Sequence, residues 1–333
     1  MAGVPAVPGR RRDRPRRRRR PERAQQDPRP AHRRGRQGRQ IDLSLLYGKP
    51  VLKAPVWHSP DIPGYLFLGG LAGASSVLAA GAQATGRRRL ALVAKTGAFG
   101  GIALSLAGLV HDLGRPARFL HMLRVVKPSS PMNVGSWLLA AYGPLAGAAA
   151  LSAVTGRMPR IGAAATAGSA LLGPAVAAYT GALVSDTAVP AWHDGYREMP
   201  YVFVGSGAAA AGGLGLIAAP EGEHQPARNL AVLGAALELA AFTRMEKRLG
   251  MVAEPYRWGR SGRYLRTGEI LSVAGMLGAL CGRRRRVVRM LSGAALLASS
   301  AATRWGIFHV GKASANDPKY TVVPQRERLR ERT

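Results

Sequence analysis

The side chains able to do chemistry lie at the ends of apolar segments in this chain. Asp61 and Tyr65 are four residues apart, so both lie on one face of a helix that begins there. His111 and Asp112 follow the second apolar segment, and Tyr179 lies near the end of the fourth. A quinone headgroup needs hydrogen-bond donors for two carbonyl oxygens and a titratable group that exchanges protons when electrons move. The two tyrosines are candidate donors, and the acids and the histidine are candidate proton acceptors.

A polar segment separates the second and third apolar segments, from His111 to Trp137 (HDLGRPARFLHMLRVVKPSSPMNVGSW). Its Asp112, Arg115 and Arg118 are candidates for a partner-docking surface or for proton transfer. Charges at the end of a membrane span need no function to be tolerated, so a loop fastened at the membrane edge explains them equally well. Asp186, after the fourth segment, is predicted to lie on the same face and is assigned the same two candidate roles.

Two acids lie inside weaker apolar segments, Glu238 in the sixth and Glu269 in the seventh. Ionisable groups within a membrane are costly and therefore informative. These two either belong to a proton path or pair with Arg244 and Arg266 near the membrane edge. Pairing is the preferred interpretation, although Glu238 stays a candidate for proton transfer or docking.

Metal chemistry is not expected within this chain. Cys281 is the only cysteine, so neither a disulfide framework nor a cysteine-ligated iron–sulfur cluster or zinc site can be built from the chain alone. His111 and His121 have no partner histidine in an opposing span and are interpreted as interfacial residues rather than haem ligands. We therefore predict no haem, no iron–sulfur cluster and no metal site here.

Eight apolar segments must position these side chains. Most reach the roughly 17–25 residues that cross a bilayer as a helix. The sixth and seventh alone would also suit buried helices of a soluble protein, but eight such segments in so short a chain favour a membrane. The sequence thus predicts an all-α membrane protein with eight transmembrane helices. The predicted spans are Ile62–Ala84, Leu90–Val110, Met132–Thr155, Ile161–Val184, Tyr201–Ala219, Ala227–Phe242, Leu265–Cys281 and Val287–Val310.

Small residues and aromatics add detail to this picture. Gly69 and Gly73 lie on one helix face, where they let a neighbouring backbone approach closely, so a tightly packed bundle is expected. Trp137 and Trp192 are interpreted as anchors in the aromatic belt at the membrane surface.

The 333-residue chain has a net charge of +30, and arginine is concentrated at its beginning. Residues 1–55 are interpreted as a basic disordered tail, because such a segment cannot bury enough apolar surface to fold. The tail is expected to be solvated or to lie against anionic lipid headgroups. It has no aromatic residues for base stacking up to residue 40, so specific nucleic-acid binding is not expected. Residues 313–333 are predicted to be a polar C-terminal tail.

The orientation of the chain in the membrane is predicted from the positions of its lysines and arginines. An even number of spans places both termini on one face, together with the loops after the second, fourth and sixth spans. Lysines and arginines in the loops are balanced between the two faces, and the basic termini favour a cytoplasmic position for both ends.

Three stretches, read together and in this order, resemble the NrfD/polysulfide-reductase family of membrane subunits. They are PGYLFLGGLAGAS, DLGRPARFLHMLRVVKPSSPMNVGSW and AYTGALVSDTAVPAWH, and the resemblance extends over residues 55–312. It implies a membrane domain over residues 56–312 with two four-helix bundles, in the plasma membrane of a bacterium. It also implies a protein without haem that exchanges electrons between a quinone, menaquinone by our interpretation, and a docked four-cluster ferredoxin-like iron–sulfur subunit. That subunit serves a molybdopterin catalytic subunit.

The resemblance also bears on the site. It places Asp61 and Tyr65 at positions of polar quinone contacts, with Tyr179 as the candidate tyrosine of the fourth span. His111 completes the predicted quinone-binding set as a candidate proton acceptor. Some relatives have Asn and His at the two first-span positions, so the headgroup contacts differ here. A transporter or channel of the same fold is the alternative. The terminal substrate, the direction of electron flow and any proton pumping stay open.

Overall fold

The computed structural model describes residues 51–53, 55–114, 121–282 and 285–330. The predicted basic tail therefore falls almost entirely outside the described residues, as do Arg115 and Arg118. Throughout the described part the regular secondary structure is helical, as the sequence predicts for an all-α protein.

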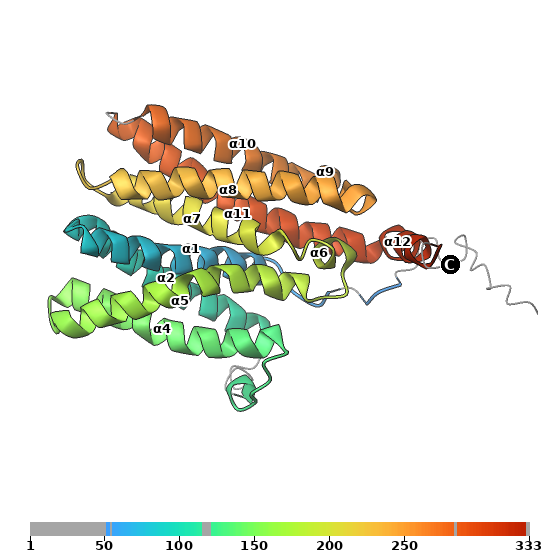
Figure 1. The fold of residues 1–333 in the computed structure, drawn as a ribbon, viewed down its shortest axis with the longest axis horizontal. Helices are drawn as coiled ribbons and strands as arrows, with labels where there is room; N and C mark the ends of the chain where they lie inside the picture. Colours follow the sequence, from blue (N-terminus) through green and yellow to red (C-terminus); the bar gives the residue numbers. More distant parts are fainter. Residues whose placement is uncertain (1–50, 54, 115–120, 283–284, 331–333) are drawn as a thin grey trace, which may run out of the picture. The chain divides into compact units, whose positions relative to one another are not determined.

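Eight of the described helices are at least 20 residues long (Figure 1). They are α1 (Asp61–Ala84), α2 (Arg88–Asp112), α4 (Pro131–Thr155), α5 (Pro159–Ser185), α7 (Met199–Ala218), α8 (Gln225–Leu249), α10 (Gly259–Cys281) and α11 (Arg286–Asn316). Shorter helices connect or follow them: α6 (Pro190–His193), the 3₁₀ helix η2 (Gly250–Ala253), α9 (Glu254–Arg257) and α12 (Lys319–Arg330).

Proline and glycine fix several of these boundaries. Pro131 opens α4 and Pro159 opens α5, positions where the missing N–H of proline costs no helical hydrogen bond. Gly156 ends α4 with φ 69°, a left-handed conformation that favours glycine. The chain therefore turns sharply between α4 and α5 and returns antiparallel beside it.

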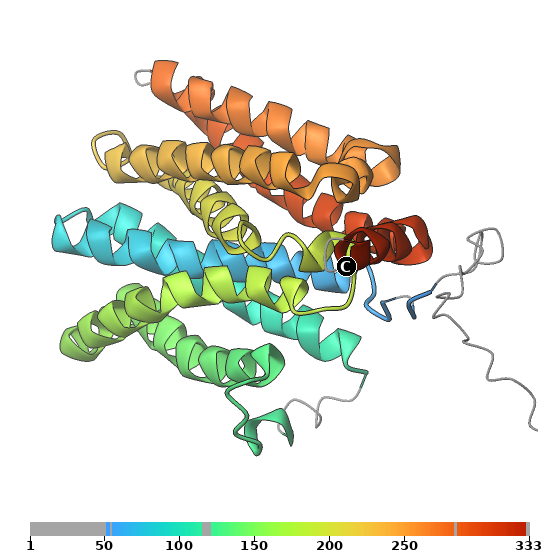
Figure 2. The same cartoon turned by 45° about the vertical axis from the view of Figure 1, so that its right-hand side comes forward.

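The long helices pack side by side in two sets (Figures 1 and 2). In the first set, α1 packs against α2 and α5, and α4 packs against α5 and α2. In the second set, α7 packs against α8 and α11, and α10 packs against α11 and α8. Helix α1 also contacts α7 and α11, which joins the two sets.

Glycine permits the closest of these helix contacts. A Cβ on Gly73 of α1 would overlap the carbonyl oxygen of Gly173 on α5, so the two backbones touch. Gly70 of α1 and Gly207 of α7 meet in the same way. The predicted close packing at Gly73 is confirmed. Helix α1 thus packs closely against helices of both sets.

Five helices are long and apolar enough to cross a membrane: α1, α2, α4, α5 and α7. The predicted count of eight spans is therefore not confirmed by length and composition, because α8, α10 and α11 do not meet the same test. The helices also extend beyond the predicted apolar limits: α8 continues to Leu249, α10 begins at Gly259, and α11 ends at Asn316. Those extensions are polar, so an apolar pattern cannot detect them. The segment predicted as a C-terminal tail contains the end of α11 and all of α12.

Candidate functional site

A mainly apolar cavity lies among α1, α2, α4 and α5, and we call it the tyrosine cavity. Its empty volume, which includes space open to solvent, is about 590 Å³. Aliphatic side chains, two methionines and one tryptophan form most of the wall, and two phenols, one hydroxyl and one carboxylate provide its polar groups. The lining residues are Trp57, Ile62, Tyr65, Leu66, Leu109, Asp112, Leu113, Met122, Met132, Ser136, Leu139, Tyr179 and Leu183.

Tyr65 and Tyr179 face this cavity from α1 and α5, and their side chains interact with each other. Tyr65 is only 2% exposed, and Tyr179 is half-buried. Gly135 of α4 makes the room for Tyr179, because a Cβ at that position would overlap the phenol ring. Two hydrogen-bonding phenols are therefore held by packing in an otherwise apolar space.

Two histidine–carboxylate pairs lie beside the tyrosine cavity. The Nδ1 atom of His111, at the end of α2, lies 2.8 Å from Oδ2 of Asp61 at the start of α1. The backbone N–H of His58 donates to Oδ1 of Asp112 at 3.1 Å, and the His58 ring lies 3.1 Å from the same oxygen. Both imidazoles are well exposed, whereas both carboxylates are largely buried. Since Asp112 lines the cavity, its pair with His58 connects the cavity wall to the surface of the protein.

The structure thus brings most of the predicted site residues together. Tyr65, Tyr179 and Asp112 line one cavity, while Asp61 and His111 form a pair next to it. Asp186 is exposed at the end of α5 and does not line the cavity.

Several lining residues were missed by sequence reasoning. No site role is predicted from the sequence for His58, Met122, Met132 or Ser136. Their contribution depends on a loop and a helix folding back over α1, which spacing within a single segment cannot reveal.

The interpretation of Trp192 as a membrane-belt anchor is wrong. Its side chain is 1% exposed, and its Nε1–H donates to the Ile307 carbonyl oxygen at 2.7 Å. Its ring also stacks on Trp57, with 5.5 Å between the ring centroids. The helix α6 folds this aromatic inward, so it supports the wall of the tyrosine cavity. Trp137 is 46% exposed, as a belt residue would be.

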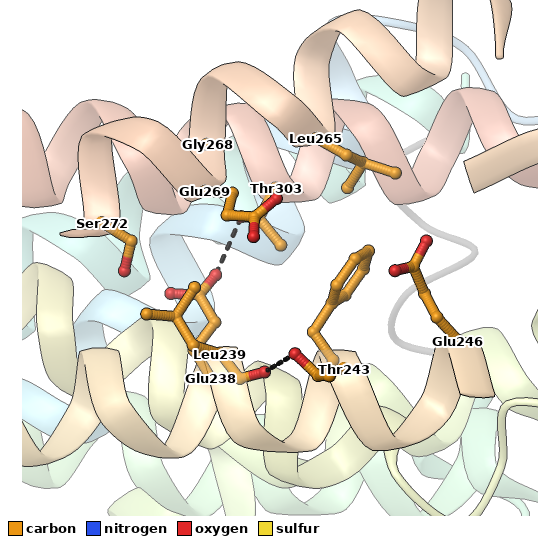
Figure 3. Close-up of a pocket in the computed structure, with 10 residues that line it drawn as sticks. Glu238, Leu239, Thr243, Glu246, Leu265, Gly268, Glu269, Ser272 and Thr303 are labelled. Carbon is orange, nitrogen blue, oxygen red and sulfur yellow. Dashed lines mark hydrogen bonds between the residues drawn. The ribbon is translucent and has the colours of Figure 1, made fainter. Parts of the chain in front are cut away.

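A second cavity lies among α8, α10 and α11, with an empty volume of about 400 Å³ (Figure 3). We call it the glutamate cavity because three carboxylates line it. Its lining residues are Glu238, Leu239, Phe242, Thr243, Glu246, Leu265, Gly268, Glu269, Ser272 and Thr303. The Glu238 side chain accepts a 2.8 Å hydrogen bond from the Thr303 hydroxyl (Figure 3). The preferred pairing of Glu238 with Arg244 is therefore wrong, and Arg244 instead lies 3.8 Å from Glu198.

Arg304 is a buried charge that sequence reasoning missed. It lies within the predicted eighth span, where a mid-span charge is itself a signal of function. The side chain is fully buried on α11 and donates from Nη2 to the Phe203 carbonyl oxygen at 2.8 Å. Its guanidinium also lies over the Phe203 ring, 3.8 Å from the centroid. Arg304 thereby ties α11 to α7 in the interior of the protein.

An ion pair between Glu198 and Arg248 fastens the helix ends on the same side as the tyrosine cavity. Arg248 donates from Nε and Nη2 to the Glu198 carboxylate, the shorter contact measuring 2.5 Å, and from Nη2 to the Asp194 carbonyl oxygen at 2.6 Å. The hydrogen bond from Arg248 lowers the pKa of Glu198, against the opposing effect of its burial. The segment between α6 and α7 is thus held to the end of α8 by a charge-assisted contact.

Within the described ranges, no three His, Cys, Asp or Glu side chains are grouped so that they could hold a metal ion.

Comparison with known proteins identifies one family. A family model described as "Polysulphide reductase, NrfD" matches residues 50–245, more than half of the chain. No curated protein matches the chain. The matched region contains every residue that lines the tyrosine cavity, and it ends within α8 at residue 245, so that it includes Glu238.

Proposed function

This chain belongs to the polysulphide reductase NrfD family, and from that premise we propose that it is the quinone-binding membrane subunit of a multi-subunit oxidoreductase. The family consists of membrane subunits of redox enzyme complexes, and the five long apolar helices agree with a membrane protein. The observation that carries the proposal is the tyrosine cavity, in which two phenols and a carboxylate lie within an apolar wall.

A quinone fits the chemistry of this wall. The flat ring offers two carbonyl oxygens that accept hydrogen bonds, and Tyr65 and Tyr179 each supply an O–H donor. Leu109, Leu139 and Leu183 provide apolar surface for the ring and its isoprenoid tail. The apolar character matches menaquinone, whose fused ring is more apolar than a benzoquinone ring.

The bound quinone supplies the redox chemistry, since it takes up two electrons and two protons when it is reduced. The residues of this chain bind it, exclude water and handle protons. Asp112 holds a proton at the cavity wall, and exposed His58 exchanges it with the surface. The Asp61–His111 pair, 2.8 Å apart, gives a second proton-exchange point beside the same wall.

Most remaining elements of the proposal follow from the family. The eight long helices form two four-helix bundles in the plasma membrane of a bacterium. The basic termini, rather than the family, are the reason for placing both ends in the cytoplasm. A four-cluster ferredoxin-like iron–sulfur subunit docks at the end of the helices beside the tyrosine cavity, where exposed Asp186 is a candidate contact. A molybdopterin catalytic subunit carries the substrate chemistry. Docking at this end of the helices would bring electrons and protons to the same end of the protein.

The test is purification of the chain from native membranes in mild detergent, followed by mass spectrometry of its partners and extraction of bound quinone. We expect an iron–sulfur protein, a molybdopterin subunit and a quinone, and we expect Tyr179→Phe to lower the quinone content. Tyr201→Phe, which changes a 60% exposed tyrosine, is the matched control. Recovery of a lone chain without quinone, together with solute flux in vesicles, would contradict the proposal in favour of a transporter.

A further inference from the structure

Glu238 is a buried carboxylate in which one oxygen accepts a hydrogen bond and the other oxygen accepts none. The side chain is 4% exposed on α8, and Oε1 accepts the hydrogen bond from Thr303. Oε2 is buried and has no hydrogen-bond partner in the protein. A buried carboxylate oxygen without a donor is costly, so this arrangement calls for a proton or a water molecule at Oε2.

The glutamate cavity is the space through which a proton or a water molecule can reach Oε2 of Glu238. Ser272 on α10 is 1% exposed, lines the same cavity and has an unpartnered hydroxyl. Glu246 and Glu269 line the cavity as well (Figure 3), and Glu269 is exposed at the outer face of α10. Hydroxyls and carboxylates from α8, α10 and α11 thus surround a polar space that can hold water.

Arg304 connects Glu238 to the opposite set of helices. It interacts electrostatically with Glu238, and its Nη1 is buried without a hydrogen-bond partner. Its Nε donates to the Leu66 carbonyl oxygen at 3.4 Å. Leu66 lines the tyrosine cavity next to Tyr65. A single buried guanidinium therefore lies between the wall of one cavity and the carboxylate of the other.

We propose that Glu238 is the proton-exchange residue of a second membrane-embedded site, coupled through Arg304 to the occupancy of the tyrosine cavity. The inference rests on the proposed quinone function for its coupling, while the proton site stands on the glutamate cavity alone. One proton binds at Oε2 through the glutamate cavity and leaves by the same route. No electron or bond other than O–H changes at this site.

The charged and titratable groups around Glu238 define the coupling. They are Glu246 on its own helix, Glu269 on α10 and Arg304 on α11, and the hydroxyl of Ser206 on α7 is a further polar neighbour. Glu246 lies 3.5 Å from Arg257, which offsets its charge. Among these charged groups, Arg304 is the one that also contacts the wall of the tyrosine cavity. A ligand that changes that wall can therefore shift Arg304, and a shift of Arg304 alters the proton affinity of Glu238.

Dicyclohexylcarbodiimide is the probe, because it reacts with protonated carboxylic acids in apolar sites. The acid O–H adds across one C=N bond, so that oxygen joins the central carbon and hydrogen joins nitrogen. The full-length chain in nanodiscs is labelled across pH, and the modified residue is located by mass spectrometry. We expect labelling at Glu238 that falls as pH rises, that is lost in Glu238→Gln and that persists in Glu269→Gln.

Coupling is measured by repeating the labelling with 2,3-dimethyl-1,4-naphthoquinone. We expect the rate at Glu238 to change by roughly fivefold or more, the lower end of typical couplings between sites. Arg304→Gln should remove that change. If this variant does not fold, Arg304→Lys keeps a charge but loses the planar contacts and should reduce the change, while Thr303→Val tests the proton site alone by altering the labelling rate.

Equilibrium binding of the same naphthoquinone separates the two proposals. Absence of binding would count against the quinone function and leave the labelling profile as the test of the proton site. Normal binding with an unchanged labelling rate at Glu238 would overturn the coupling. A folded protein with no labelling of Glu238 at any pH would overturn the proton site itself.

Discussion

Gly135 controls the position of Tyr179, and its substitution by alanine should weaken quinone binding. A Cβ at Gly135 would overlap the ring and hydroxyl of Tyr179. The α4 and α5 backbones are packed against each other, so the phenol must rotate away. Overpacking of this kind costs typically about 1–3 kcal/mol. If quinone binding requires the phenol to return to its original position, the same free energy opposes binding, and the affinity falls by roughly 5-fold to 150-fold.

The assay is equilibrium binding of a radiolabelled menaquinone analogue to the chain in nanodiscs. Gly143→Ala is the matched control, because it lies on the same helix and a Cβ there meets only Leu106, at 4.0 Å. Thermal unfolding of both variants confirms that each is folded at the assay temperature. Equal affinity of folded Gly135→Ala and Gly143→Ala would refute the role given to Tyr179.

Three further results are expected. Tyr65→Phe removes one donor and should weaken binding of the same analogue by about 2-fold to 12-fold, the equivalent of 0.5–1.5 kcal/mol; an unchanged affinity would remove Tyr65 from the headgroup contacts. Because Arg248 lowers the pKa of Glu198, the pair stabilises the fold above the unfolded pKa near 4.3, and this stability is lost as pH falls through the lower folded-state pKa. Glu198→Gln should therefore flatten the loss of thermal stability between about pH 5 and pH 2, and an identical pH profile would contradict this. Tyr142→Phe loses the 2.6 Å hydrogen bonds that join its hydroxyl to the Ala72 carbonyl oxygen and the Ser76 hydroxyl, and should lower the unfolding free energy by about 1–3 kcal/mol; no shift in the midpoint of thermal unfolding would show that these bonds contribute little.

The first five apolar segments were predictable because their composition is almost entirely apolar, with Lys95 as the exception in the second. The predicted Ile62–Ala84 and Met132–Thr155 differ from α1 and α4 by a single residue at one end. Prolines and glycines at the helix ends reinforce the pattern there. The later helices were harder to predict, since α8 and α10 alternate apolar residues with charges and their polar turns lie outside any apolar window.

The site was predictable in part for the same reason. Tyr65, Asp112 and Tyr179 each lie at a segment end on one face, so topology alone brings them together. Their partners depend on contacts between distant segments, as with His58 and Asp112, 54 residues apart. Arg304 shows the opposite case, because its position within an apolar segment was visible in the sequence, but only the structure reveals its contacts with α1 and α7.

Quinone binding in the tyrosine cavity can be tested by photo-cross-linking of the full-length chain in nanodiscs with an azido-naphthoquinone, followed by mapping of the modified peptides. We expect labels in the peptides that contain Trp57–Leu66 and Met132–Leu139, with competition by unlabelled quinone and a loss in Gly135→Ala but not in Gly143→Ala. Labels confined to the glutamate cavity, or to lipid-facing residues such as the 80% exposed Leu171, would contradict it.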